Sequence, residues 1–208
     1  MRQRLSETLQ TAATDALEQR VKPVEALADD AEQVAAACHA MAIRFHRGGK
    51  LVCFGSGGPS TDAQHIAVEF VHPVIVGKRA LPAISLTGDV ATLTSIASRE
   101  GYAKVYAHQL RYLAAPEDIA LGVSVDGNDP AVLAGLEAAA ELGMLTIALV
   151  GGDGGETAGS AAVHHVLVAR SDDPLVVKEV HVTAYHILWE LVHVLFEQPG
   201  VLDPEVIR

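Results

Sequence analysis

Aromatic residues, cysteines and clustered positive charge are all scarce in this sequence, and each shortage excludes a class of protein. Only 4% of the 208 residues are aromatic while 50% are apolar, so alanine, valine, leucine and isoleucine have to build the core. The formal net charge is −11 with no Lys/Arg cluster, which argues against nucleic acid or an anionic membrane as a partner. No run approaches the about 18 apolar residues of a membrane span, and no apolar signal core opens the chain, so we expect a cytoplasmic protein.

The chain has only two cysteines, Cys38 and Cys53. Cys38 falls in a helical pattern and Cys53 in an apolar strand. These positions predict two small buried hydrophobic side chains and no disulfide.

From residue 50 onward, short apolar segments alternate with helical patterns. The predicted strands are 51–55, 83–86, 119–124, 146–151 and 163–169. The predicted helices lie near 61–72, 89–98, 103–114, 130–142, 155–160 and 174–197. This alternation predicts a three-layer α/β/α sandwich around a five-stranded parallel sheet. Ligands in such sheets bind beyond the carboxyl ends of the strands, which directs attention to loops 55–61, 86–89, 124–130 and 151–155.

Two helices are predicted before the first strand. Apolar residues at intervals of four predict a helix over 5–21 that Pro23 interrupts, and a second helix that stops at Gly48–Gly49. We therefore divide the chain into N-terminal helices (1–48), a main domain (49–198) and a short tail (199–208). Half-apolar helices outside a sandwich usually pack onto another subunit or onto the flank of their own domain, and we assign 1–48 to oligomerisation.

Loop 55–61 reads GSGGPST and precedes the helical segment DAQHIAVEF. It lacks the third glycine of the dinucleotide fingerprint. The backbone N–H groups of Ser56, Gly57 and Gly58 suit an anion at a helix start, although a tight strand-to-helix turn explains the same residues. On the helix that follows, His65 and Glu69 are four residues apart and share a face, as a functional pair or an ordinary surface pair would.

Three segments together resemble the SIS (sugar isomerase) family in order and spacing: GSGGPSTDAQHIAVEF (55–70), the stretch 121–155, and KEVHVTAYHILWELVHVLFE (178–197). Within that family they are most similar to phosphoheptose isomerases. The resemblance implies a flavodoxin-like strand order and a homotetramer with active sites between subunits. It also implies aldose–ketose isomerisation of sedoheptulose 7-phosphate, commonly with bound zinc.

The resemblance also implies roles for individual residues. Glu69 corresponds to the catalytic base and His186 to an acid or base. The zinc ligands correspond to His65, Glu69, His186 and position 178. Asp89 matches a family position, where it either binds substrate hydroxyls or caps its helix. Two further residues of the last helix, Glu190 and His193, are predicted to lie on a solvated stripe.

Position 178 departs from the family, because a lysine stands where a zinc-binding glutamine is usual. An ammonium group has no lone pair to give to a metal, which puts a four-ligand zinc site in question. Lys178 either pairs with Glu69, and so replaces the charge of the metal, or extends into solvent. In both cases it borders the expected substrate site.

Loop 124–129 departs too, since it reads Ser-Val-Asp-Gly-Asn-Asp where Ser-Thr-Ser-Gly-Asn-Ser is usual. Asp129 precedes Pro130 and is predicted to cap a helix. No such role is predicted for Asp126. A carboxylate about 4 Å from a phosphate charge makes the binding free energy of that phosphate less favourable by about 4 kcal/mol at an effective dielectric near 20. The loop therefore disfavours phosphate, although Ser124, Asp126 and Asn128 remain candidate contacts for a sugar.

Two functions of different classes follow. The first is a phosphoheptose-isomerase-like enzyme that converts sedoheptulose 7-phosphate, or a related sugar or sugar phosphate, through an enediol, with Glu69 and His186 exchanging protons with the sugar. The alternative is a non-catalytic SIS protein that binds a sugar phosphate or docks onto a protein partner. Zinc is the one cofactor that either reading invokes.

Overall fold

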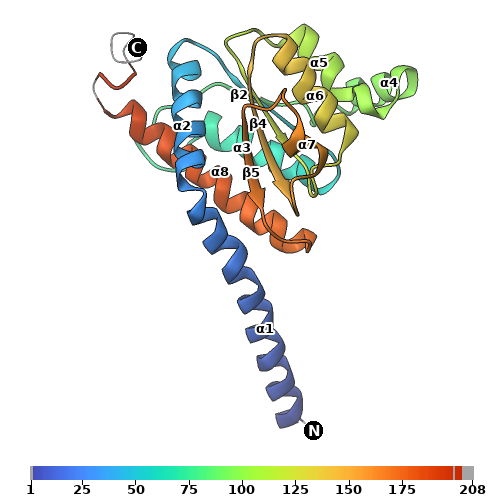
Figure 1. Cartoon of the computed structure of the whole chain (residues 1–208), viewed down its shortest axis with the longest axis vertical. Coiled ribbons are helices and arrows are strands. Elements are labelled where there is room, and N and C mark those ends of the chain that lie inside the picture. The colour runs from blue at the N-terminus through green and yellow to red at the C-terminus, as the bar shows by residue number, and fades with distance from the viewer. Residues whose placement is uncertain (1, 199, 203–208) are drawn as a thin grey trace.

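The computed structural model describes residues 2–198 and 200–202, so most of the predicted tail lies outside the described residues. Five parallel strands form one sheet in the order β2-β1-β3-β4-β5. They are β1 (Leu51–Gly55), β2 (Ala83–Ser85), β3 (Ile119–Val123), β4 (Leu145–Gly151) and β5 (His165–Ala169). This order is flavodoxin-like, and the predicted parallel α/β sandwich is confirmed (Figure 1).

Helices cover both faces of the sheet. They are α2 (Ala31–His46), α3 (Gly58–Val71) and α8 (Pro174–Phe196) on one face, and α4 (Val90–Glu100), α5 (Val105–Leu113) and α6 (Pro130–Glu141) on the other. A 3₁₀ turn, η1 (Tyr102–Lys104), leads into α5, and the short α7 (Gly155–Gly159) follows β4. None of the described helices combines the length and apolar composition required to span a lipid bilayer.

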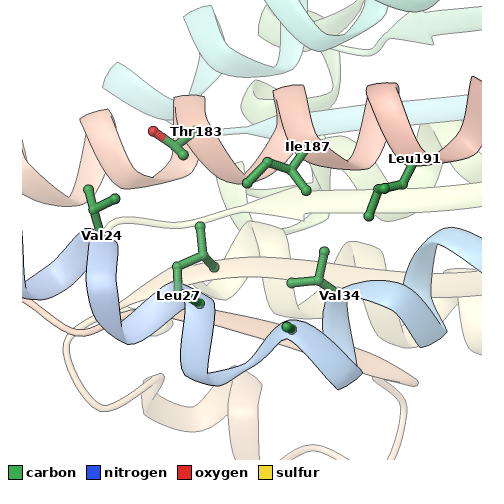
Figure 2. A pocket seen from close by; sticks show the side chains of 8 residues that line it. Val24, Leu27, Val34, Thr183, Ile187 and Leu191 are labelled. Carbon is green, nitrogen blue, oxygen red and sulfur yellow. The ribbon is translucent and has the colours of Figure 1, made fainter.

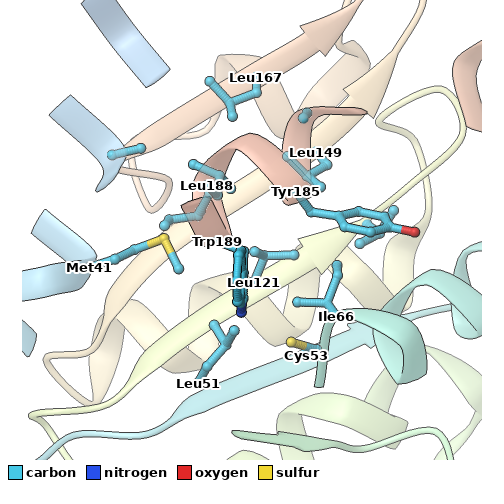
Figure 3. Close-up of a cluster of buried hydrophobic side chains, with 14 of the residues drawn as sticks. Met41, Leu51, Cys53, Ile66, Leu121, Leu149, Leu167, Tyr185, Leu188 and Trp189 are labelled. Atoms are coloured by element: carbon cyan, nitrogen blue, oxygen red, sulfur yellow. The ribbon is translucent and has the colours of Figure 1, made fainter. Parts of the chain in front are cut away.

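Alternation along the strands divides the core into two layers. Leu51 and Cys53 of β1 pack toward α2, α3 and α8, while Val52 and Phe54 pack toward α5 and α6. Figure 3 shows the first layer, in which Leu188 and Trp189 of α8 lie above strand residues such as Leu121. Cys38 and Cys53 are free and buried, as predicted.

The predicted break at Pro23 is wrong. Helix α1 runs from Arg2 to Asp29 with Pro23 inside it, and the chain turns at Asp30 before α2. Proline removes the hydrogen bond to the carbonyl four residues earlier, here that of Gln19, but Gln19 is exposed and water can replace the lost donor. The first two-thirds of α1 project away from the domain (Figure 1).

The end of α1 and the start of α2 lie along α8. Between them runs an apolar groove of about 260 Å³, which carries no titratable side chain. Figure 2 shows Leu27 and Val34 on one wall and Ile187 and Leu191 on the other. This groove belongs to the packing of the N-terminal helices and offers no group for chemistry.

Candidate functional site

The site lies between α3 and α8, which pack against each other on one face of the sheet. Strand β1 ends at Gly55, and the chain reverses into α3 through Gly57, whose φ of +65° favours glycine. Pro59 lies in the first turn of α3, where its missing N–H costs little. This turn directs the face of α3 that carries His65 and Glu69 toward α8.

His65, Glu69 and His186 come together as the sequence predicts. Their ligand-capable side-chain atoms all lie within 4.8 Å of one another. His65 Nε2 is 3.1 Å from Glu69 Oε1, and the rings of His65 and His186 meet edge to face with centroids 5.3 Å apart. Two imidazoles and a carboxylate can hold a metal ion or exchange protons with a ligand.

Two residues that the sequence analysis missed orient this cluster. The Tyr185 hydroxyl is 2.8 Å from His65 Nδ1, and Trp189 Nε1 donates to the Glu69 carbonyl at 2.9 Å. Burial, and then the nearby carboxylates of Asp62 and Glu69, raise the pKa of Tyr185, so its hydroxyl keeps its proton. A buried Tyr and Trp on an apolar helix resemble core residues in sequence, and only the facing helix reveals their second role.

Glu69 and His186 open onto a cavity of about 450 Å³. Its apolar wall comes from α8 and from the segment after α3, with residues such as Trp189, Val74 and Ile75. The Glu69 side chain is only 14% exposed, whereas His186 is exposed. A carboxylate that is largely shielded from solvent beside an accessible imidazole is a suitable arrangement for proton transfer.

Lys178 takes neither of the two positions considered for it. Its ammonium lies 2.7 Å from Asp62 Oδ1 and 3.0 Å from Thr61 Oγ1, at the first turns of α3. Glu69 is seven residues further along α3, or about 10 Å, and does not pair with Lys178. The Asp62 side chain is 4% exposed, so a buried carboxylate holds the lysine away from the His65 cluster.

The loop 124–129 is occupied by its own side chains. Four backbone N–H groups donate to side-chain oxygens of the loop: Gly127 to Ser124, Asn128 to Asp126, and Ala131 and Val132 to Asp129. Asp129 caps α6, as predicted. The expectation that Asp126 has no local role is wrong, because its carboxylate closes the turn at 2.9 Å from the Asn128 nitrogen.

Other candidate residues are placed as follows. Asp89 caps α4 by accepting hydrogen bonds from the backbone and hydroxyl of Thr92, which lower the pKa of Asp89. Of the two roles considered for Asp89, the structure shows the helix cap. Ser56 and Gly58 lie in the turn before and at the start of α3, and the buried Oγ of Ser56 lies near the Tyr106 hydroxyl.

His193 is buried rather than solvated, which corrects the prediction. Its ring nitrogens lie 2.8 Å from the Trp189 carbonyl oxygen and 2.9 Å from that of Arg79. It therefore ties α8 to the segment before β2. Glu190, by contrast, is exposed, as predicted, at the rim of the cavity.

A family model described as "SIS domain" matches residues 15–151. A phosphoheptose isomerase from Solidesulfovibrio magneticus is 42% identical over 177 residues, which is 85% of each chain. One from Aquifex aeolicus is 37% identical over 78% of this chain and 84% of its own. The chain belongs to the SIS domain family, within its phosphoheptose isomerase subfamily.

Solved structures from this subfamily have the same fold. The phosphoheptose isomerase from Neisseria gonorrhoeae superimposes with a TM-score of 0.81 at 27% identity, covering 88% of this chain and 98% of that one. The phosphoheptose isomerase from Francisella tularensis gives 0.82 at 28% identity, covering 88% and 97%. The SIS domain of this chain thus has subfamily relatives that match it over nearly their whole length.

The Lys178–Asp62 pair yields a stability prediction. Lys178→Met leaves the buried Asp62 carboxylate without its cation, and we expect the free energy of unfolding to fall by about 1–3 kcal/mol. Urea denaturation followed by circular dichroism measures this. Arg20→Met is the matched control, because Arg20 pairs with the exposed Glu179, and its loss should cost less than about 1 kcal/mol. Equal losses of unfolding free energy in the two variants would show that the Lys178–Asp62 pair matters no more than an exposed ion pair.

Proposed function

We propose that the chain is an aldose–ketose isomerase that acts on sedoheptulose 7-phosphate or a related sugar or sugar phosphate. One observation carries this proposal: Glu69 and His186 reach the same cavity from two facing helices, with His65 beside both. Membership of the phosphoheptose isomerase subfamily supports it.

The reaction moves one proton between adjacent carbons and another between their oxygens. The Glu69 carboxylate removes the proton from the hydroxyl-bearing carbon beside the carbonyl, which gives an enediol, and returns it to the former carbonyl carbon. The His186 imidazole gives a proton to the carbonyl oxygen and takes one from the neighbouring hydroxyl. Imidazole is the side chain that most often serves both roles in enzymes. No electrons leave the sugar, so no redox cofactor is required.

We further propose that His65, Glu69 and His186 bind a divalent metal ion, for which zinc is the best match. Zinc takes imidazole nitrogens and carboxylate oxygens. With His65 Nε2 as a ligand, Nδ1 would carry the ring proton and donate a hydrogen bond to the Tyr185 hydroxyl, which would hold the ring in place. Lys178 supplies no fourth ligand, because its ammonium binds Asp62. A bound ion would polarise the sugar oxygens, which is the role that His186 has when no ion is bound.

We also propose that the protein assembles as a homotetramer through α1, with active sites between subunits. Leu9, Leu17, Val21 and Val24 are 40–66% exposed and fall within one stripe of the helix. An exposed apolar stripe on a projecting helix is favourable only if another surface covers it. A second copy of α1 is the simplest such surface.

Glu69→Gln is the test of catalysis. Without a carboxylate to take the carbon-bound proton, turnover should fall by about 10²–10⁴-fold, with an unchanged melting temperature. The assay follows interconversion of aldose and ketose, with sedoheptulose and its 7-phosphate as starting sugars. Glu179→Gln, an exposed carboxylate on α8, should retain full activity. A wild-type chain that converts neither sugar, yet is stabilised by one, would favour the non-catalytic sugar-binding alternative.

Elemental analysis tests the metal site. We expect about one zinc ion per chain after equilibration with zinc, and a loss of most of it in His65→Ala and His186→Ala, because each removes one of three ligands. His108→Ala removes a partly exposed histidine that pairs with Glu100, away from this cluster, and should leave the zinc content unchanged. Equal zinc in all four proteins would show that this cluster does not bind it.

Light scattering tests the role of α1. Leu17→Glu places a charge in the apolar stripe and should shift the protein to a smaller species. Gln19→Glu adds the same charge on the opposite side of the helix and should leave the assembly intact. If the wild-type chain is monomeric, or if both variants behave alike, α1 is not the assembly surface.

A further inference from the structure

A second cavity, of about 280 Å³, lies between the first turns of α3 and α8. Its wall includes Pro59, Asp62, Val125, Leu175, Lys178 and His181. Asp62 precedes Glu69 by seven residues on α3, so this cavity lies about 10 Å from the proton-transfer pair along the same helix. A linear sugar chain with its reacting carbons at Glu69 would extend toward it.

The helix starts around this cavity offer little to an anion. The N-terminus of α8 is capped by its own Asp173, which accepts from the Leu175 nitrogen at 2.9 Å. Pro59 removes one N–H from the first turn of α3. In loop 124–129, four N–H groups already donate to side chains of the loop, and two of the accepting residues are the aspartates 126 and 129. A phosphate at this loop would meet carboxylates in place of free donors.

Lys178 does not restore a positive site. Its charge is balanced by Asp62 at 2.7 Å, and a second N–H goes to Thr61. One N–H of the ammonium remains for a ligand. Lys178 therefore offers a single hydrogen bond from a pair with no net charge.

His181 provides the complementary acceptor. It is 2% exposed and lines the cavity, and its Nε2 atom has no partner among the described residues. Burial lowers the pKa of His181, against the smaller opposing effect of a ring hydrogen bond to the Val150 carbonyl. The neutral ring thus donates from Nδ1 and leaves a lone pair on Nε2. A buried acceptor without a donor is costly, and a ligand hydroxyl would satisfy it.

We propose that this cavity binds the uncharged, hydroxyl-bearing end of the sugar, and that Asp126 and Asp129 exclude a phosphate from loop 124–129, which borders the cavity through Val125. One hydroxyl can accept from Lys178 and a neighbouring one can donate to His181, as vicinal hydroxyls of a polyol do. The substrate class is then an unphosphorylated aldose–ketose pair of heptose size. This inference rests on the proposed isomerase function and narrows its substrate.

The test compares the binding of sedoheptulose and sedoheptulose 7-phosphate by calorimetry, in a full-length Glu69→Gln background that needs no turnover. We expect the neutral sugar to bind about tenfold more tightly or better. Asp126→Asn keeps the turn and removes the charge, so it should raise the affinity for the 7-phosphate by about tenfold or more and leave that for sedoheptulose unchanged.

Asp153→Asn is the matched control. Asp153 closes a similar turn in the next loop, with Oδ1 at 3.0 Å from the Gly155 nitrogen, and its substitution changes the net charge equally. It should alter neither affinity appreciably. His181→Phe, checked for folding by circular dichroism, should weaken sedoheptulose binding by about tenfold, because it removes the acceptor.

Tighter binding of the 7-phosphate by the parent protein would overturn the inference, as would binding of neither sugar or equal effects of Asp126→Asn and Asp153→Asn. These outcomes are separable from failure of the proposed function. Turnover of a tightly bound 7-phosphate refutes only the substrate class. Preferred binding of sedoheptulose without turnover in the wild-type chain refutes only the isomerase.

Discussion

The contact between α3 and α8 is the constraint on which the site depends. Two hydrogen bonds define it: Tyr185 to the His65 ring, and the Trp189 indole to the Glu69 carbonyl. Tyr185 and Trp189 stand on a helix whose other face fills the core beside β1, β3 and β4. Because the Tyr and Trp are buried, the positions of His65 and Glu69 are set by core packing, and a rotation of α8 would disrupt the core and the proton-transfer pair together.

Placement of charge separates the site into two parts with different chemistry. At one end of the α3–α8 contact, His65, Glu69 and His186 gather, and Lys78 on the wall of their cavity is paired with Glu197. At the other end, Lys178 is neutralised by Asp62. The buried carboxylate thus has two effects: it keeps an ammonium from competing for Glu69, and it removes the net positive charge that a phosphate would require.

Much of the fold could be predicted, because apolar strands alternating with helices admit few architectures and the resemblance set the strand order. The cluster of His65, Glu69 and His186 was predictable from the same resemblance. The partner of Lys178 was not, since a four-carbon side chain reaches several carboxylates and only coordinates show that Asp62 is the buried one. The break predicted at Pro23 was wrong, because a helix can continue through a proline where solvent can hydrate the carbonyl that loses its hydrogen bond. The prediction that His193 is solvated failed, and the role of His181 was not foreseen, because a histidine on a long helix carries no sequence mark of burial.

The net charge of the chain bears on the choice of substrate as well. At −11, the protein repels a phosphate ester, and screening over about 8 Å at physiological ionic strength removes only the part of that repulsion that comes from more distant charges. Close to loop 124–130, two aspartates act inside that length. Binding an anion there would need compensating cations, and the one lysine on the cavity wall is already paired. A neutral polyol meets no such barrier, because its hydroxyls match groups that are polar, fixed and uncharged in sum.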